Sequence, residues 1–187
     1  MHLTLELLVL AFGSASYAVG ARDILVGRYA PSVFSRVVWL LLAGISTAGV
    51  VASGSGSGAV LLAGVFLVGN AVICLLSTWR GTRGIGPLEY ACLGILALSG
   101  LVWLVFDAPV LSLVISLLAH LVGGAPTYRR AWQRPGSESA GFWSLFFVAS
   151  VFSLLASLGE PARSLVFPLY FTLFDGGMTL LALRRQR

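Results

Sequence analysis

Long runs of apolar residues alternate along this chain with short segments rich in Arg, Pro, Gly or Ser. Each run is about as long as the roughly 20 residues that a helix needs to cross the hydrocarbon core of a bilayer. The pattern therefore predicts seven transmembrane helices joined by short loops, with an uncharged Gly/Ser turn between the second and third. The runs are Leu3–Ala21, Phe34–Ala52, Gly58–Trp79, Pro87–Phe106, Pro109–Thr127, Gly141–Leu158 and Ser164–Leu183.

The composition excludes a water-soluble fold. Of the 187 residues, 58% are hydrophobic and 10% are charged, whereas about a quarter of the residues in a soluble domain are charged. The fold class that we expect is an all-α integral membrane protein. All 12 basic residues are Arg, so Schiff-base chemistry on a lysine is impossible. Cys74 and Cys92 lie inside apolar runs without other metal ligands at a suitable spacing, and we interpret both as packing residues.

The Arg residues predict how the helices are oriented. With seven spans, eleven of the 12 Arg fall on one face of the membrane and Arg163 lies alone on the other. Basic residues close to membrane spans favour the cytoplasmic side. We therefore expect a multi-pass protein of the cytoplasmic membrane, with its N-terminus outside and its C-terminus inside. The net charge of +5 then serves orientation, and no nucleic-acid partner is expected.

A weak internal repeat relates the first three predicted helices to the last three. Shifting the chain by about 104 positions aligns Trp39 with Trp143, and one more position aligns Asn70 with Asp175. Two three-helix units face the same way only if a single helix separates them, as in parallel transporter repeats. The expected arrangement is 3+1+3: residues 1–83 form the first bundle, 84–107 the inverter helix and 108–187 the second bundle.

The second repeat contains a motif that resembles a known family. The segment Pro126-Thr127-Tyr128-Arg129-Arg130-Ala131-Trp132, followed by Ser137-Glu138-Ser139, resembles the PQ-loop pattern of the SWEET and SemiSWEET sugar transporters. In that family two facing Asn residues line a central sugar site, and Asn70 and Asp175 look like that pair. The resemblance implies a transporter with a central site. The chain departs from the pattern where Thr127 replaces Gln and Asp175 replaces Asn.

Three polar residues, Asn70, His120 and Asp175, lie near the middle of their predicted spans. A charge at the bilayer centre costs about 2.5–3.5 kcal/mol on insertion scales, so ionisable residues there need partners or water. Two interpretations stay open for the Ser residues on the same helix faces, a solute cavity or close helix packing. Trp39 and Trp143 are expected to be anchors at the membrane interface.

From these residues we expect passage of a small polar solute, such as a sugar, through a site between the two bundles. The expected solute-binding residues are Asn70, Asp175, His120, Ser16 and Ser116, and the expected gate is formed by Pro126 and Thr127, because proline cannot donate a backbone hydrogen bond. The alternative is a receptor or assembly subunit whose polar core only sets helix register. No enzyme activity, metal or cofactor is expected. The partners are the solute and the lipid bilayer, and a homo-oligomer is permitted but not required.

Overall fold

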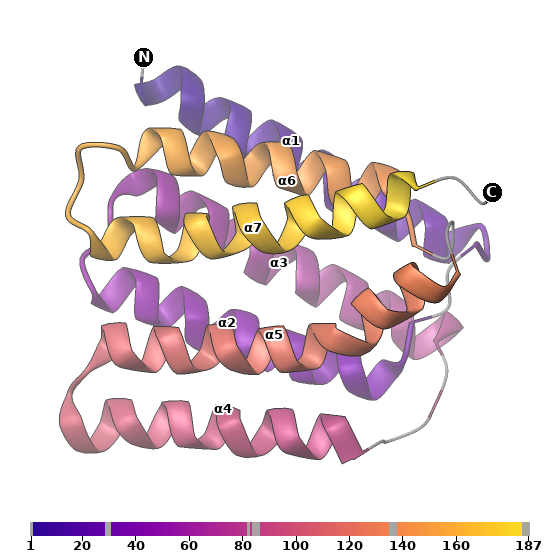
Figure 1. The fold of residues 1–187 in the computed structure, drawn as a ribbon, viewed down its shortest axis with the longest axis horizontal. Coiled ribbons are helices and arrows are strands. Elements are labelled where there is room, and N and C mark those ends of the chain that lie inside the picture. Colours follow the sequence, from indigo (N-terminus) through magenta and orange to yellow (C-terminus); the bar gives the residue numbers. More distant parts are fainter. Residues whose placement is uncertain (1, 29–30, 82, 84–86, 135–137, 185–187) are drawn as a thin grey trace.

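A computed structural model describes residues 2–28, 31–81, 83, 87–134 and 138–184, with the backbone alone for Leu88, Glu89 and Pro126. These residues form seven α-helices (Figure 1). Six of the seven predicted apolar runs lie within one helix each, whereas the run Gly141–Leu158 extends two residues past the helix that ends at Ala156. The described part of the chain is all-α, as predicted. The helices are α1 His2–Leu25, α2 Val33–Ala52, α3 Ser57–Arg80, α4 Pro87–Phe106, α5 Pro109–Gln133, α6 Ala140–Ala156 and α7 Arg163–Leu183.

Five of these helices, α1, α2, α3, α5 and α7, are long and apolar enough to cross a membrane. The other two apolar stretches, Tyr90–Phe106 in α4 and Ala140–Ala156 in α6, are shorter. At 1.5 Å per residue, the 17 residues of α6 extend about 26 Å, slightly less than the roughly 30 Å of a hydrocarbon core. The helices indicate a multi-pass membrane protein.

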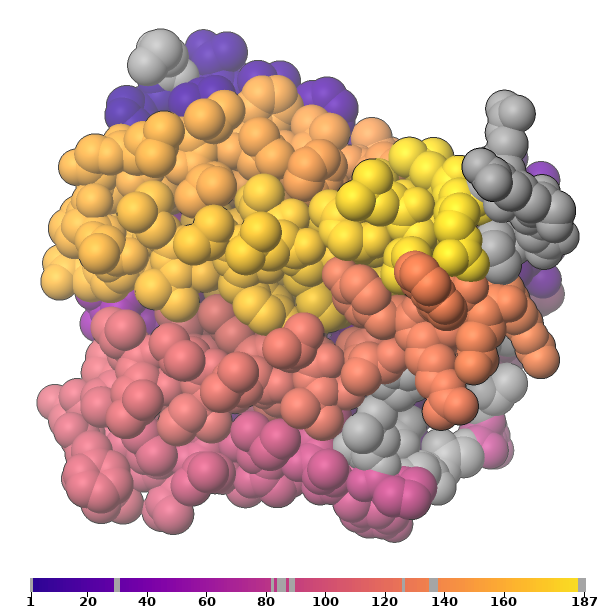
Figure 2. All heavy atoms as spheres, in the orientation of Figure 1, coloured from indigo at the N-terminus to yellow at the C-terminus, as the bar shows by residue number. Residues whose placement is uncertain are grey.

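Two inner helices organise the bundle. α3 packs against α1 and α2, and α7 packs against α5 and α6. In addition α1 packs along α6 and α2 along α5, while α4 packs mainly against α5 at the edge of the bundle (Figure 1). On the face drawn in Figure 2, the side chains of α7 lie between those of α6 and α5. Because α3 and α7 also contact each other, side chains from both reach the centre.

The two ends of the bundle differ in composition. We call the end where α1, α3, α5 and α7 finish the Arg-rich end, because nine of the ten Arg residues in the described part of the chain lie there. We call the opposite end the Gly/Ser end. There, residues 53–56 join α2 to α3 and residues 157–162 join α6 to α7. Arg163 is the described Arg at the Gly/Ser end.

The core is aromatic and centred on α3. Phe66 is 3% exposed, and its ring centroid lies 4.7 Å from that of Phe171 on α7 and 6.2 Å from that of Phe146 on α6. Aromatic pairs at such separations add to the free energy of burial. These rings hold α3, α6 and α7 together at the depth where the polar residues described below lie.

α5 continues past its predicted end. It runs through Pro126 to Gln133, and Figure 1 shows its last part bending toward α7. A proline inside a helix removes one backbone hydrogen bond and crowds the preceding turn, which bends the helix. The bent part is attached to α7, because the Tyr128 hydroxyl donates to the carbonyl of Phe174. Thr127 is half-buried within this part, and the side chain of Pro126 lies outside the described residues.

Candidate functional site

The polar residues predicted at mid-span meet around one small cavity. Asn70 on α3, His120 on α5 and Asp175 on α7 are each at most 2% exposed, and all three line it. The cavity has a volume of about 10 Å³, which is room for about one water molecule. The structure is therefore closed around this site. The remaining lining residues are Tyr17, Arg36, Trp39, Phe66, Phe142, Trp143, Phe146 and Phe171.

Asn70 is held by α1 and by its own helix. Its Nδ2 atom donates to the Tyr17 hydroxyl at 2.9 Å and to the carbonyl oxygen of Phe66 at 2.8 Å. The Tyr17 ring lies over Gly69, where a Cβ atom would be 2.2 Å from the ring. Glycine at position 69 thus allows Tyr17 to approach α3 closely enough to accept the amide proton.

Asp175 receives a hydrogen bond from α6. The Ser150 hydroxyl lies 3.2 Å from its Oδ2 atom, and the same hydroxyl lies 2.9 Å from the carbonyl oxygen of Phe146. An ionised carboxylate accepts about four hydrogen bonds. Asp175 can therefore accept further donors from a molecule in the cavity.

His120 is enclosed by aromatic rings. Its Nδ1 atom lies 2.8 Å from the Tyr170 hydroxyl, and its ring centroid is 4.6 Å from that of Trp39 and 4.7 Å from that of Phe174. The Nε2 atom is buried and has no hydrogen-bond partner among the described residues. An unpaired buried polar atom costs about 1–3 kcal/mol, a cost that a water or a solute in the cavity would remove.

The two predicted Ser residues lie outside the described lining of the cavity. The Ser16 hydroxyl donates to the carbonyl oxygen of Phe142 at 2.7 Å and so joins α1 to α6. The Ser116 hydroxyl lies 2.9 Å from that of Ser46 and so joins α5 to α2. In this structure both act in helix packing, which is the second of the two interpretations that the sequence left open.

The expectation that Trp39 and Trp143 anchor the chain at the membrane interface is wrong for this structure. Both line the central cavity, and Trp143 is 5% exposed. Their position near the helix starts suggested an interface, but the bend of α5 and the packing of α7 cover them. Tyr17 was also missed as a central residue. Tyr17 follows Ser16 directly in the sequence, and both residues are buried on α1. This adjacency was the sequence signal that could have placed Tyr17 in the centre.

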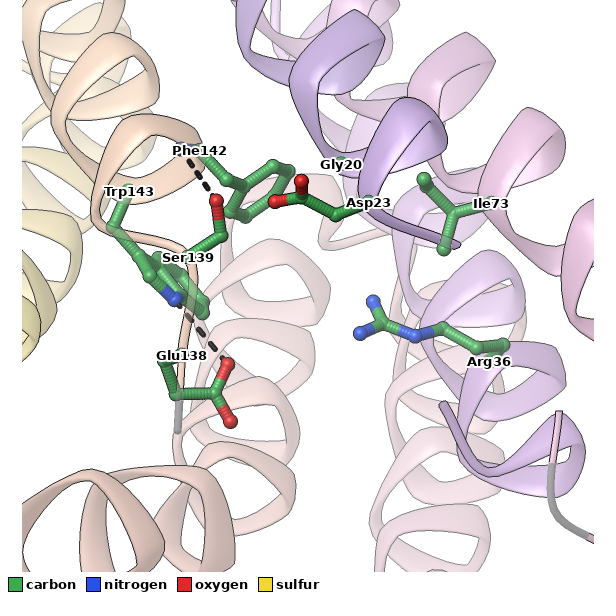
Figure 3. Close-up of a pocket in the computed structure, with 8 residues that line it drawn as sticks. All are labelled: Gly20, Asp23, Arg36, Ile73, Glu138, Ser139, Phe142 and Trp143. Carbon is green, nitrogen blue, oxygen red and sulfur yellow. Dashed lines mark hydrogen bonds between the residues drawn. The ribbon is translucent and has the colours of Figure 1, made fainter. Parts of the chain in front are cut away.

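A second hollow lies at the Arg-rich end, next to the cavity. It has a volume of about 30 Å³, and Arg36, Phe142 and Trp143 line both spaces. Figure 3 shows Arg36 and Glu138 extending into it from opposite sides, with Asp23 on α1 above them. These shared residues separate the central cavity from the Arg-rich end.

Glu138 is a buried acid at this hollow. Its side chain is 5% exposed and lies 3.9 Å from Arg130, and the indole Nε1 of Trp143 donates to its Oε2 atom at 3.5 Å. The Oε1 atom has no hydrogen-bond partner among the described residues. Burial raises the pKa of Glu138, and the Arg130 guanidinium offsets part of this increase.

The Gly/Ser end is closed by hydrogen bonds between the loop 53–56 and the start of α7. The backbone N–H of Gly56 donates to the Ser164 hydroxyl at 2.9 Å, and the Arg163 guanidinium donates to the carbonyl oxygen of Gly54 at 3.4 Å. Just inside these contacts, the Ser153 hydroxyl donates to the carbonyl oxygen of Gly58 at 2.8 Å. Helices α3 and α6 also approach each other closely at this end: a Cβ added to Gly58 would lie 2.7 Å from the Cβ of Ala156.

The described residues contain no group of three or more His, Cys, Asp or Glu side chains that could hold a metal ion. Cys74 and Cys92 are both buried free cysteines. No family model matches the chain, and no curated protein or solved structure matches it either.

Proposed function

We propose that this chain is a membrane transporter that moves a small polar solute through a site between two three-helix units. The observation that carries the proposal is the meeting of Asn70, His120 and Asp175, from three helices, around one buried cavity. Buried polar groups inside a membrane are costly and are found where solutes, ions or protons pass. An amide, an imidazole and a carboxyl together offer both hydrogen-bond donors and acceptors to a polar solute.

The packing of the helices supports the two units. α3 lies between α1 and α2, and α7 lies between α5 and α6. In each unit, the third helix therefore packs between the first two. The contact of α1 with α6 corresponds, under the proposed repeat, to the contact of α5 with α2. An approximate two-fold axis between the two units would make these two contacts equivalent. The resemblance to the SWEET and PQ-loop transporters belongs to this proposal.

A transport cycle needs the cavity to open, because a volume of about 10 Å³ admits no solute larger than water. The Arg-rich end is the proposed route of opening, since a second hollow already reaches Arg36, Phe142 and Trp143 from that side. The bent end of α5 is the proposed moving part, which keeps Pro126 and Thr127 in a gating role. In the proposed orientation this end faces the cytoplasm.

The test is solute flux in liposomes that contain the purified protein. Uptake of labelled sugars, polyols and amino acids should exceed that of empty vesicles for at least one solute. Asp175→Ala should lower this uptake at least tenfold, while Ser99→Ala should leave it unchanged. Ser99 is the matched control, because it is equally buried but hydrogen-bonds Ser112 outside the cavity.

The alternative, a non-transporting protein with a polar core, predicts a different result. Wild-type protein would then match empty vesicles for every solute in the panel, although it remains monodisperse and helical. The small cavity of the closed structure is the observation that favours this alternative.

A further part of the proposal is that Asp175 couples solute movement to protons. Asp175→Asn would keep the hydrogen-bonding shape and remove the titrating group. We expect flux through this variant to lose its pH dependence. Flux with an unchanged pH profile would show that Asp175 does not carry the proton.

A further inference from the structure

An apolar groove runs along the outside of the bundle between α1 and α3. Its volume is about 590 Å³, far larger than that of the central cavity. Small residues line the α1 side, Ser14, Ala18 and Ala21, and Gly64, Val68 and Val72 line the α3 side. Val68 is 64% exposed and Val72 43%, so the groove opens away from the protein core. In a membrane it faces the lipid.

The length of the groove matches one acyl chain. On α1 its lining extends from Leu10 to Ala21, and on α3 from Val60 to Val72. At 1.5 Å per residue these stretches are about 16–18 Å long. One leaflet contributes about half of the roughly 30 Å hydrocarbon core, or about 15 Å.

The groove points toward residues that suit a phospholipid headgroup. Arg22 is exposed in the last turn of α1, four residues after Ala18, and Trp79 is 72% exposed on α3, seven residues after Val72. Residues four or seven positions apart lie on about the same helix face. Trp favours the membrane interface, and Arg binds phosphate oxygens strongly. Both lie at the Arg-rich end, where a headgroup would be.

Tyr17 connects this groove with the polar centre. Its side chain lines both the groove and the central cavity, and its hydroxyl accepts the hydrogen bond from Asn70. A chain lying in the groove would contact one side of the Tyr17 ring, while Gly69 supports the other.

We propose that this groove is a phospholipid site, with one acyl chain between α1 and α3 and the phosphate close to Arg22. Through Tyr17, the bound lipid holds Asn70 in its position at the cavity. The lipid site depends only on the chain lying in a membrane. Its effect on solute binding rests on the proposed function.

Gly64 provides a direct test, because a Cβ there meets no atom within 4 Å. Gly64→Leu should place its side chain in the groove, since Gly64 lines it and the added Cβ has open space. The matched control is Gly94→Leu on α4, where a Cβ also meets nothing within 4 Å. Each protein would be released from nanodiscs of phosphatidylglycerol, and the lipids retained per chain would be counted by native mass spectrometry.

We expect wild type and Gly94→Leu to retain one more phosphatidylglycerol per chain than Gly64→Leu does. Arg22→Gln should lower retention of this lipid several-fold by removing the phosphate partner. Equal retention by wild type and Gly64→Leu would overturn the proposal. So would a wild-type dimer that Gly64→Leu converts to a monomer, because a second copy would then occupy the groove.

Ser14→Leu is the second variant, should Gly64→Leu fail to fold, because Ser14 is an exposed residue on the opposite wall. It should remove the same lipid. The lipid count does not depend on transport activity. A chain that retains the lipid but moves no solute would contradict the proposed function and leave the lipid site standing.

Discussion

The two ends of the bundle are closed by different kinds of contact. At the Gly/Ser end, the short loop 53–56 meets the start of α7 through backbone groups and hydroxyls, as in the bond from Gly56 to Ser164. At the Arg-rich end, charged side chains such as Arg36 and Glu138 surround a hollow of about 30 Å³ (Figure 3). Close contacts between backbone groups and short side chains leave little room for movement, whereas long side chains can change rotamer.

In the proposed transport cycle, this difference favours opening at the Arg-rich end. Opening the Gly/Ser end would break several hydrogen bonds together and separate α3 from α6, where Gly58 and Ala156 are in close contact. Opening the Arg-rich end needs movement of Arg36, Phe142 and Trp143, which line both the hollow and the central cavity. We therefore expect the Gly/Ser end to act as the fixed end in the structure described here.

The largest expected effect is all-or-none and tests whether the two ends face opposite sides of the membrane. In a background with Cys74 and Cys92 replaced by Ala, Ala162→Cys should react in intact cells with a membrane-impermeant maleimide. Arg134→Cys should react only after the membrane is permeabilised, because juxtamembrane Arg favours the cytoplasm. Both sites are exposed in the structure. Reaction of both from the same side would contradict the seven-span arrangement.

The next effect is a loss of stability on crowding the Gly/Ser end. Gly58→Leu places a Cβ 2.7 Å from that of Ala156 and 3.2 Å from the carbonyl oxygen of Ser153. Overpacking of this kind costs about 1–3 kcal/mol. Thermal unfolding in detergent micelles should show a lower midpoint for this variant.

Gly100→Leu is the control for this measurement, because a Cβ at Gly100 meets nothing within 4 Å. It should unfold close to the wild-type temperature. If both variants lost the same stability, helix contact at Gly58 would not be the cause.

The smallest expected effect concerns the pH dependence of the Arg-rich end. Burial raises the pKa of Glu138 in the folded protein. The acid therefore stabilises the fold fully below its unfolded pKa of about 4.3, and this contribution is lost as pH rises through the folded pKa. As pH rises from about 4.3 to the folded pKa of Glu138, the free energy of unfolding of the wild type should fall. Glu138→Gln should make this decrease smaller.

The matched control is Glu160→Gln, which makes the same substitution at an exposed position of the Gly/Ser end. The measurement is chemical unfolding in micelles at a series of pH values. A pH profile that Glu138→Gln leaves unchanged would mean that Glu138 is not buried in solution as it is here.

Much of the helical layout could be predicted from the sequence. The predicted run Pro87–Phe106 coincides with α4, and the run Phe34–Ala52 differs from α2 by one residue. The end of α5 was predicted at Thr127 and lies at Gln133. The apolar run stops at Thr127, but contacts of the bent part with α7, such as that of Tyr128 with Phe174, keep the chain helical beyond it.

The candidate site was predictable in part. Asn70, His120 and Asp175 stood out because polar residues are rare at mid-span, and all three line the cavity. Ser16 and Ser116 were expected beside them but face neighbouring helices instead. A Ser hydroxyl can hydrogen-bond to a nearby carbonyl oxygen or to another Ser. Its position on a helix therefore does not indicate which neighbouring group is its partner.

The amino-acid sequence was enough to predict a helical, apolar chain and the polar residues that lie near the middle of its helices. Apolar length and residue spacing decide these features locally, before any two helices meet. The sequence did not reveal that Tyr17 accepts a hydrogen bond from Asn70, that Trp143 is buried, or that the loop 53–56 bonds to the start of α7. These contacts depend on the rotation and tilt of each helix against its neighbours, which packing between distant segments sets.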